Sequence, residues 1–315
     1  MPELPEVEVI RRGLTRRLVG RRFVAVSKGD RKLRQDVPLE GLQRLVTGRR
    51  LVKVGRRGKY LLLHLEGGAV LVIHLGMTGR LLICSDQRPP FPATERNRGH
   101  RACEPALSYD LPGVKTVGGE SRQEWAAAEL PHVHWSFQLE GDLWLLYQDV
   151  RRFGQVLVYP PGEPMDVLAR LGREPFSPQV TPEWLMNLAR GRRRPLKNFL
   201  LDGRIITGVG NIYACEIMFA ARLHPTLPVG CLSRGDWQHL IKEMRRLLRL
   251  AIRRGGTTVN DYLNCEGQTG LFQLDLMVYG RAGEPCRKCG DTILRLVQGG
   301  RSTFFCPQCQ PNRSI

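Results

Sequence analysis

The pattern of apolar and polar residues in the first half of the chain predicts one helix followed by many short strands. Apolar residues recur at helical spacing between Glu6 and Leu18, with arginines on the opposite face. Short apolar runs separated by glycine-containing turns then predict strands at Phe23–Val26, Leu51–Val54, Tyr60–Leu65, Ala69–Leu75, Leu81–Cys84, His134–Leu139, Leu143–Tyr147 and Gln155–Tyr159. Many strands with few helices between them favour a β-sandwich over a doubly wound parallel sheet.

Two segments interrupt this pattern. Residues from about 88 to 130 are rich in Pro, Gly and charge without a sustained period, so we expect a surface insertion there. Pro160-Pro161-Gly162 is typical of a domain boundary. Beyond it the pattern predicts helices at Pro182–Ala189, Pro195–Leu201, Asn211–Ala221 and Arg234–Arg253. The sequence therefore predicts an α+β chain of three domains: a β-sandwich with flanking helices (residues 1–160), a helical domain (161–276) and a small cysteine-rich module (277–315).

The charge of the chain points to a polyanionic partner. Lys and Arg number 48 against 30 Asp and Glu, which gives a net charge of +18. No apolar stretch approaches the roughly 18 residues that span a bilayer, so nucleic acid is preferred to a membrane as the partner. The nine cysteines are an odd number and follow no secretory signal, which argues against a secreted disulfide framework. We expect a cytoplasmic protein.

Four cysteines near the C-terminal end have the spacing of a zinc site. Cys286 and Cys289 form one pair, Cys306 and Cys309 form another, and sixteen residues separate the pairs. The segments between the pairs predict a hairpin that brings the two turns together. Four protein ligands leave no open position, so we expect one structural Zn²⁺. The alternative is two unrelated pairs of reduced cysteines. Arg301 lies at the expected hairpin tip, where it is either a solvated turn residue or a phosphate contact.

The N-terminus offers a possible nucleophile. Removal of Met1 would leave a free amine on Pro2, and an α-amine has a reference pKa of about 7.7–8.0, well below that of Lys. Such an amine can attack an aldehydic sugar carbon and form a Schiff base. Glu3 beside it is a candidate general acid or base. On these residues alone, however, an ordinary Met-Pro start is the simpler interpretation.

Six motifs in order change that interpretation. They are Met1-Pro2-Glu3-Leu4-Pro5-Glu6, Gly58-Lys59-Tyr60, His74-Leu75-Gly76-Met77-Thr78-Gly79, Arg151-Arg152-Phe153-Gly154, Gly208-Val209-Gly210-Asn211-Ile212-Tyr213 and the four-cysteine hairpin. Together they resemble the bacterial formamidopyrimidine-DNA glycosylase family, also called 8-oxoguanine DNA glycosylase/AP lyase. The resemblance covers nearly the whole chain except residues 88–130.

The resemblance implies an activity and a set of catalytic residues. Members of the family excise oxidised purines from duplex DNA and nick the resulting abasic site by β,δ-elimination. By the match, Pro2 is the nucleophile and Glu3 transfers protons at the sugar. Lys59 resembles the lysine that contacts phosphate and assists δ-elimination. Arg301 resembles the zinc-finger arginine that holds the phosphates beside the lesion.

The same resemblance implies the residues that bind DNA. Met77, Arg151 and Phe153 match the three side chains that fill the space left by the flipped base. Residues 202–213 resemble the helix-two-turn-helix of the family, in which Asn211 is expected to contact a phosphate. Lys197 and His134 are weaker matches to a lysine near the lesion and a histidine near the phosphate path.

Two rival functions are kept. One is an endonuclease VIII-type glycosylase for oxidised pyrimidines, against which Leu4 and the Arg151/Phe153 pair argue. The other is a non-catalytic DNA-binding zinc protein. We expect a monomer that acts on damaged double-stranded DNA at the bacterial nucleoid, without a membrane partner.

Overall fold

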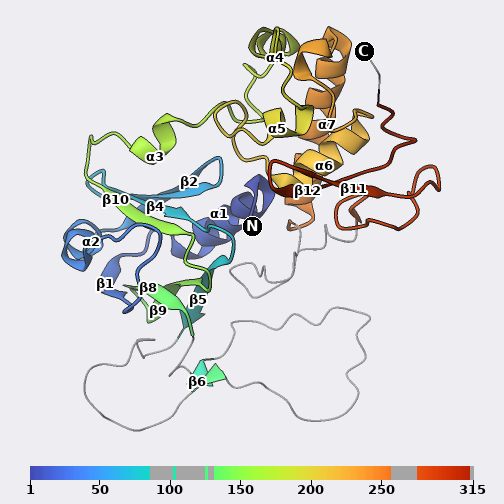
Figure 1. Ribbon diagram of the computed structural model, residues 1–315. Coiled ribbons are helices and arrows are strands. Elements are labelled where there is room, and N and C mark those ends of the chain that lie inside the picture. The colour runs from blue at the N-terminus through green and yellow to red at the C-terminus, as the bar shows by residue number, and fades with distance from the viewer. Residues whose placement is uncertain (86–101, 104–124, 127–130, 257–274, 313–315) are drawn as a thin grey trace, which may run out of the picture.

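The computed structural model describes residues 1–85, 102–103, 125–126, 131–256 and 275–312. A β-rich part, a helical part and a C-terminal hairpin follow one another along the chain (Figure 1). Most of the predicted insertion lies outside the described residues. Within it, the two-residue strands β6 (Ala102–Cys103) and β7 (Trp125–Ala126) pair in antiparallel fashion.

Two four-stranded antiparallel sheets form a sandwich in the N-terminal part. Their strand orders are β1-β8-β9-β5 and β10-β4-β3-β2. The strands are β1 (Phe23–Lys28), β2 (Leu51–Arg57), β3 (Tyr60–Leu65), β4 (Val70–His74), β5 (Gly79–Ser85), β8 (Val133–Leu139), β9 (Leu143–Asp149) and β10 (Gln155–Tyr159). Leu63 from one sheet and Phe137 from the other belong to a single buried cluster, as expected for two apolar faces that pack together.

Two helices flank the sandwich. Helix α1 (Leu4–Leu18) begins with a capping box, in which Glu3 and Glu6 each bond the other's main-chain N–H, and its apolar stripe joins the sandwich core. Helix α2 (Leu39–Val46) packs against β1 and β10. It is not predicted from the pattern, because it has eight residues and buries little beyond Leu42 and Val46.

The helical part has a core of its own. It contains α3 (Asp166–Ala169), α4 (Pro182–Ala189), α5 (Leu196–Leu200), α6 (Asn211–Ala220), the short 3₁₀ helix η1 (Val229–Cys231) and α7 (Arg234–Arg253). Thr181 and Ser233 cap α4 and α7 with their hydroxyl groups. Residues 212–219 of α6 are all buried, because α5, α7 and the C-terminal hairpin surround this helix.

The C-terminal hairpin consists of β11 (Leu294–Gln298) and β12 (Arg301–Phe305). Gly299 and Gly300 form its turn with φ angles of 55° and 72°, a left-handed conformation that favours glycine. An apolar cluster that includes Phe219 of α6 and Ile293 joins this module to the helical part.

The predicted fold class is confirmed. The structure has the sandwich with flanking helices, the helical domain and the four-cysteine hairpin, and the predicted strands and helices lie within a few residues of the observed ones. The exact domain limits stay predictions. Among the described residues, no helix is long and apolar enough to cross a membrane.

Candidate functional site

Glu3 joins the start of the chain to the start of α6. Its Oε2 accepts a hydrogen bond from Gly210 N at 2.6 Å, and its Oε1 accepts one from Ile212 N at 2.9 Å. The Glu3 side chain therefore occupies the N-terminus of α6, where the free N–H groups and the helix dipole favour a carboxylate. A Cβ at Gly210 would lie 2.3 Å from the Glu3 carboxyl carbon, so this close approach requires glycine.

Glu6 supports this arrangement from the first turn of α1. Its Oε2 accepts the Glu3 N–H at 2.8 Å, and its Oε1 accepts the Tyr213 hydroxyl at 2.7 Å. Leu4 N also donates to Gly208 O across the same junction, at 3.0 Å. Three residues of the N-terminal segment and four of the helical turn thus share one network, although about 200 positions separate the two segments in the chain.

Lys59 comes from the turn between β2 and β3. This turn is fixed against the helical part, because Gly58 N donates to Glu174 Oε1 at 2.6 Å and the Arg56 guanidinium binds the same carboxylate. A Cβ at Gly58 would lie 2.2 Å from the Thr207 hydroxyl oxygen. Lys59 therefore extends from a rigid turn at the boundary between the β-rich and helical parts.

Arg301 reaches the same region from the hairpin. Ser302 O, directly after Arg301, accepts hydrogen bonds from Lys197 Nζ at 3.0 Å and from Asn211 Nδ2 at 2.9 Å. Lys197 Nζ also donates to the Thr303 hydroxyl at 2.6 Å. In this structure Lys197 and Asn211 position the strand that carries Arg301, and Lys197 is fully buried.

The pKa shifts of Glu3, Lys59 and the N-terminal amine depend on one another, so these groups lie close together. Burial lowers the pKa of Lys59, and the negative charge of Glu3 opposes this shift while Arg301 adds to it. Burial raises the pKa of Glu3, against the effect of Lys59 and of the hydrogen bonds at α6. The α-amine of Met1 has a pKa lowered by burial, with Glu3, Glu6 and Lys59 as charged neighbours. We call Glu3 and Lys59 beside the N-terminus, together with Arg301 beside Lys59, the interdomain site.

The four cysteines form a metal centre. Cys286, Cys289, Cys306 and Cys309 have sulfur atoms within 4.8 Å of one another. The Cys286–Cys309 and Cys289–Cys306 sulfur pairs are 3.9 and 3.4 Å apart. Tetrahedral zinc with Zn–S bonds of about 2.3 Å requires sulfur separations of about 3.8 Å, so these residues fit the ion.

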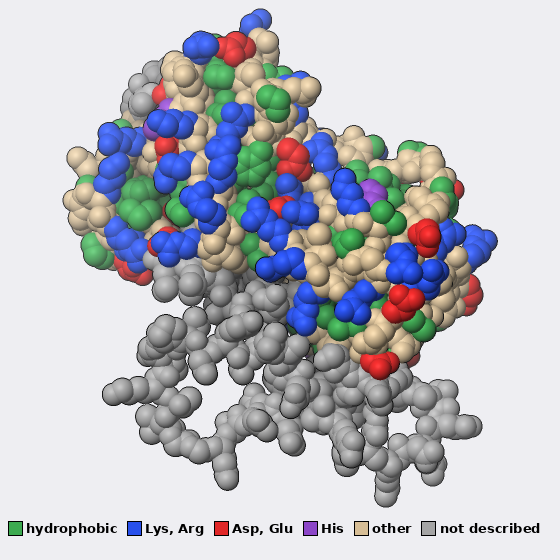
Figure 2. All heavy atoms as spheres, turned by 180° about the vertical axis from the view of Figure 1, so that it is seen from behind, with side chains coloured by type: hydrophobic (Ala, Val, Ile, Leu, Met, Phe, Trp, Pro, Cys, Tyr) green, Lys and Arg blue, Asp and Glu red, His purple; other side chains and the backbone are tan. Residues whose placement is uncertain are grey.

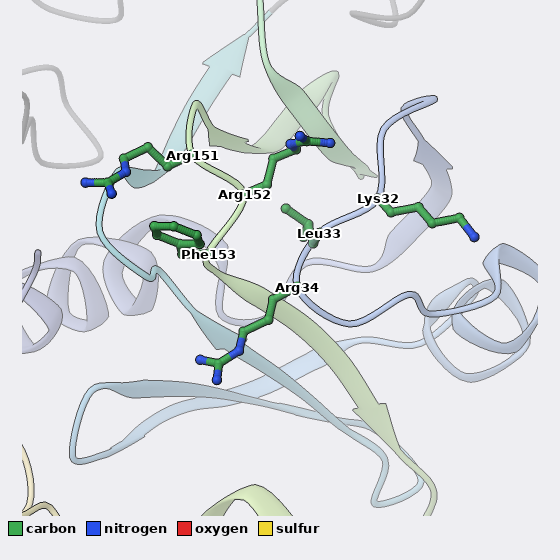
Figure 3. A pocket seen from close by; sticks show the side chains of 6 residues that line it. All are labelled: Lys32, Leu33, Arg34, Arg151, Arg152 and Phe153. Atoms are coloured by element: carbon green, nitrogen blue, oxygen red, sulfur yellow. The ribbon is translucent and has the colours of Figure 1, made fainter.

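Met77, Arg151 and Phe153 lie on two neighbouring loops of the sandwich. Met77 is 42% exposed and Phe153 is 45% exposed, so both large apolar side chains are accessible to a partner. The Arg151 guanidinium lies 4.8 Å from the centre of the Phe153 ring, and Figure 3 shows the two side chains together. We call the Met77 turn and residues 151–153 the wedge loops.

A hollow of about 630 Å³ adjoins the wedge loops. It is lined by Leu33 and Phe153 and by the cations Lys32, Arg34, Arg151 and Arg152. Figure 3 shows that Arg152 points away from Arg151, although the two are neighbours in the chain. Among the described residues no carboxylate lines this hollow, so its lining has the charge expected beside a nucleic-acid backbone.

His134 differs from its prediction as a phosphate contact. The imidazole is 2% exposed, its Nε2 lies 2.8 Å from Asp149 O and its Nδ1 lies 3.2 Å from Arg31 O. A ring so placed in β8 fixes the main chain at Arg31 and at Asp149, two residues before Arg151. Sequence periodicity does not reveal this, because the partners lie on other segments of the chain.

Basic side chains are not confined to these sites. Figure 2 shows Lys and Arg spread over both large parts of the molecule on the face opposite to that in Figure 1. The net charge therefore indicates the partner without locating the site.

Three acidic residues are missing from the sequence prediction of the site. Glu6, Glu174 and Asp149 each hold a loop or helix end that carries a candidate residue. For Glu6 a signal exists, since its position three residues after Glu3 is that of a capping box. For Glu174 and Asp149 the partners are set by the tertiary fold.

Family models match three segments of the chain. Residues 1–156 match the formamidopyrimidine-DNA glycosylase N-terminal domain, residues 171–262 match the helix-two-turn-helix domain of the same enzyme, and residues 283–312 match the zinc finger found in this glycosylase and in isoleucyl-tRNA synthetase. Two curated relatives named formamidopyrimidine-DNA glycosylase are 42% identical (Paraburkholderia phymatum) and 40% identical (Methylococcus capsulatus). Both alignments cover 98% of this chain and all of the relative.

Solved structures agree with this relationship. The Fpg protein of Thermus thermophilus is 36% identical, with a TM-score of 0.74 and 98% of both chains covered. A Lactococcus lactis Fpg mutant in complex with DNA that contains Fapy-dG is 28% identical, with a TM-score of 0.79, 99% of this chain and all of that chain covered. The chain therefore belongs to the formamidopyrimidine-DNA glycosylase family, DNA-binding zinc-finger glycosylases of base excision repair.

Proposed function

We propose that this glycosylase excises oxidised purines, 8-oxoguanine and formamidopyrimidines, from duplex DNA and nicks the abasic site by β,δ-elimination. The observation that carries the proposal is the interdomain site. There a buried carboxylate and a lysine lie beside the N-terminus, and the hairpin arginine interacts with that lysine. The Lactococcus lactis relative, in structures with DNA that contains Fapy-dG or an abasic site, supports this substrate class.

In this mechanism Pro2 is the nucleophile. Once Met1 is removed, the amine belongs to Pro2, which is itself buried, and burial favours the neutral, nucleophilic form of an amine. Attack of this nitrogen on the anomeric carbon of deoxyribose displaces the damaged base and leads to an iminium intermediate. Glu3, next in the chain, protonates and deprotonates the sugar during ring opening and elimination. Its raised pKa suits a group that must both donate and accept a proton.

Two cations bind the phosphates that flank the sugar. Lys59 contacts phosphate and assists δ-elimination, and its lowered pKa makes proton exchange easier than for an exposed lysine. Arg301 holds the phosphates beside the lesion with a planar donor group. Lys197 and Asn211 position Arg301 through their hydrogen bonds to Ser302 O. To contact a phosphate directly, the Asn211 side chain would have to rotate away from Ser302 O towards the DNA.

The wedge loops replace the extruded base. Met77 and Phe153 are apolar wedges for the unstacked step, and Arg151 hydrogen-bonds the orphaned cytosine. His134 supports these loops from beneath. One structural Zn²⁺, held by the four cysteines, orients the Arg301 hairpin. We expect a monomer that works on chromosomal DNA in the bacterial cytoplasm.

Borohydride trapping tests the mechanism. Full-length protein of verified N-terminal mass is incubated with an 8-oxoguanine:cytosine duplex and sodium borohydride, which reduces an iminium to a stable covalent bond. We expect a trapped complex with the wild type and none with Pro2→Gly. Absence of a wild-type complex, or a complex unaffected by Pro2→Gly, would refute the covalent mechanism. A wild type that binds but never cleaves would support the non-catalytic alternative.

A second candidate substrate is an oxidised pyrimidine. The Lactococcus lactis relative is also known in complex with DNA that contains an oxidised pyrimidine. Rates of excision of 8-oxoguanine and of thymine glycol, each opposite its normal partner base, decide between the two. A faster rate on thymine glycol would contradict the purine assignment.

A further inference from the structure

Asp149 lies beneath the wedge loops and has no part in the proposed chemistry. It ends β9, is 0% exposed, and its carboxylate oxygens have donors from two separate loops. Oδ1 accepts the Thr78 hydroxyl at 2.6 Å and the Arg151 N–H at 3.3 Å. Oδ2 accepts the Gly154 N–H at 2.8 Å and the Tyr147 hydroxyl at 3.4 Å. One buried side chain therefore binds both loops that carry the wedge residues.

The two loops are also in close contact with each other. Arg151 N lies 3.0 Å from the Thr78 hydroxyl oxygen, so this N–H is shared between Thr78 and Asp149. A Cβ at Gly76 would lie 2.6 Å from the main chain of Phe153 and Gly154. The Met77 turn therefore cannot move independently of the Phe153 loop without breaking these contacts.

The backbone between the two Asp149 contacts is strained. Arg152 has a φ of 58°, a left-handed conformation that is costly for a residue with a side chain. The N–H groups of Arg151 and Gly154 lie on either side of it, and both donate to the Asp149 carboxylate. This turn directs Arg152 away from Arg151 and Phe153, as Figure 3 shows. Asp149 is thus the acceptor that holds the unfavourable conformation in place.

We propose that Asp149 is a positioning residue for base extrusion, which couples the Met77 turn to the Arg151–Phe153 loop so that the three wedge side chains enter DNA as one unit. The inference rests on the proposed function, because it assumes that these side chains fill the space of a flipped base. It assigns to Asp149 no contact with DNA. It predicts a defect in extrusion and opposite-base recognition that leaves the sugar chemistry intact.

Asp149→Asn is the direct test. An amide replaces one acceptor oxygen by an N–H₂ group, which would face donors that are already buried. We expect excision of 8-oxoguanine from duplex DNA to slow at least tenfold and the preference for cytosine opposite the lesion to fall. Cleavage of a single-stranded abasic oligonucleotide, which needs no void filling, should change less than twofold. The matched control is Asp142→Asn, the same change in the exposed β8–β9 turn.

Coupling is tested by a double-mutant cycle. In the wild type, Met77→Ala and Phe153→Ala should be strongly non-additive in duplex excision, because the loops act together. In the Asp149→Asn background the two effects should become additive. Unchanged coupling, or equal losses on duplex and single-stranded substrates, would overturn the proposal. If Asp149→Asn does not fold, Thr78→Val removes the hydrogen bond from the Thr78 hydroxyl to Asp149. We expect Thr78→Val to slow duplex excision by less than tenfold, and Thr78→Ser, which keeps the hydroxyl, to excise at the wild-type rate.

A measurement on the protein without DNA tests this inference independently of the proposed function. Amide hydrogen exchange at Arg151 and Gly154 should be slow in the wild type and faster in Asp149→Asn, without any DNA present. A wild type with slow exchange but no excision would refute the proposed function alone. Fast exchange in the wild type would refute the role of Asp149.

Discussion

The interdomain site and the wedge loops are built in opposite ways. The interdomain site takes Glu3, Lys59 and Arg301 from three parts of the chain, and its carboxylate is buried at the N-terminus of α6. The wedge loops come from a single sandwich, and Met77 and Phe153 are exposed while the supporting Asp149 is buried. In the first region the reactive group is itself part of the protein's internal hydrogen bonding. In the second, the side chains proposed to contact DNA are exposed, and the residue that holds their loops in place, Asp149, is a different, buried one.

Because of this difference, substitutions in the two regions should have different consequences. A substitution at Glu3 changes both a proposed proton-transfer group and the joint between two domains. A substitution at Phe153 changes a contact surface and leaves the sandwich beneath it in place. Four predictions test this contrast, and they follow from the largest expected effect to the smallest.

The largest effect is expected for Glu3→Gln. Loss of a positioned general acid–base should lower excision by about 10²–10⁴-fold. The amide also presents a donor to the N–H groups of α6, so the melting temperature should fall. Single-turnover excision, together with affinity for a duplex bearing an abasic analogue, measures both parts. Exposed Glu140→Gln is the control. A Glu3→Gln rate within tenfold of wild type would contradict the proposed role.

Loss of zinc should weaken DNA binding strongly and leave the rest of the fold in place. A metal ion held by the four cysteines would connect the two turns that support the Arg301 hairpin, so Cys306→Ser should reduce duplex affinity by at least tenfold. Fluorescence anisotropy measures affinity, and metal analysis confirms the loss of zinc. Cys231→Ser, an exposed cysteine outside the cluster, should bind as the wild type does. Metal-free protein with normal affinity would show that the hairpin does not depend on the ion.

Phe153→Ala should have a moderate effect. Stacking of a base on an aromatic ring contributes about 1–3 kcal/mol, so excision from duplex DNA should slow by roughly tenfold. Thermal stability should stay close to that of the wild type, because the ring is half exposed. The neighbouring exposed Val150→Ala serves as control, and equal losses in the two variants would argue against a wedge.

The smallest effect is a pH-dependent change in stability at Glu8. This residue binds Arg11 and Arg12 on α1 and Arg56 on β2, and hydrogen bonds from Arg11 and Arg12 lower its pKa from 4.5 to about 2 against the effect of burial. Since the folded pKa is depressed, the stabilisation is present above pH 4.5 and is lost as the pH falls towards 2. Glu8→Gln should cost about 1 kcal/mol at pH 7, after allowance for solvent screening, and little at pH 2. Urea unfolding at several pH values measures the difference, and a pH-independent cost would exclude this ion pair as its source.

Local pattern predicts the elements of this fold well. The spacing of Val7, Ile10 and Leu14 predicts α1, and the predicted helix starts at Pro182 and Arg234 coincide with those of α4 and α7. The four cysteines predict their own cluster, because metal ligation constrains their spacing in the chain. Helix α2 escapes prediction because its apolar stripe is too short to show a period.

Contacts between distant segments are beyond such prediction. Nothing in the local sequence of Glu3 indicates that it caps a helix 207 residues later, or that Lys197 and Asn211 bind the residue after Arg301. His134 is predicted at the DNA surface from resemblance, yet β8 carries it into the interior. The residue types are therefore readable from sequence, whereas their roles as supports depend on packing.

The position of Glu3 at the end of α6 has a consequence for when the protein becomes active. The sandwich and the helical part each have a separate apolar core, and the polypeptide between them is exposed at Pro161–Pro164. Each half can therefore collapse alone during synthesis, but the carboxylate acquires its partners only when the two halves dock. A half-made chain would therefore lack the hydrogen bonds from Gly210 and Ile212 that hold the Glu3 carboxylate in place.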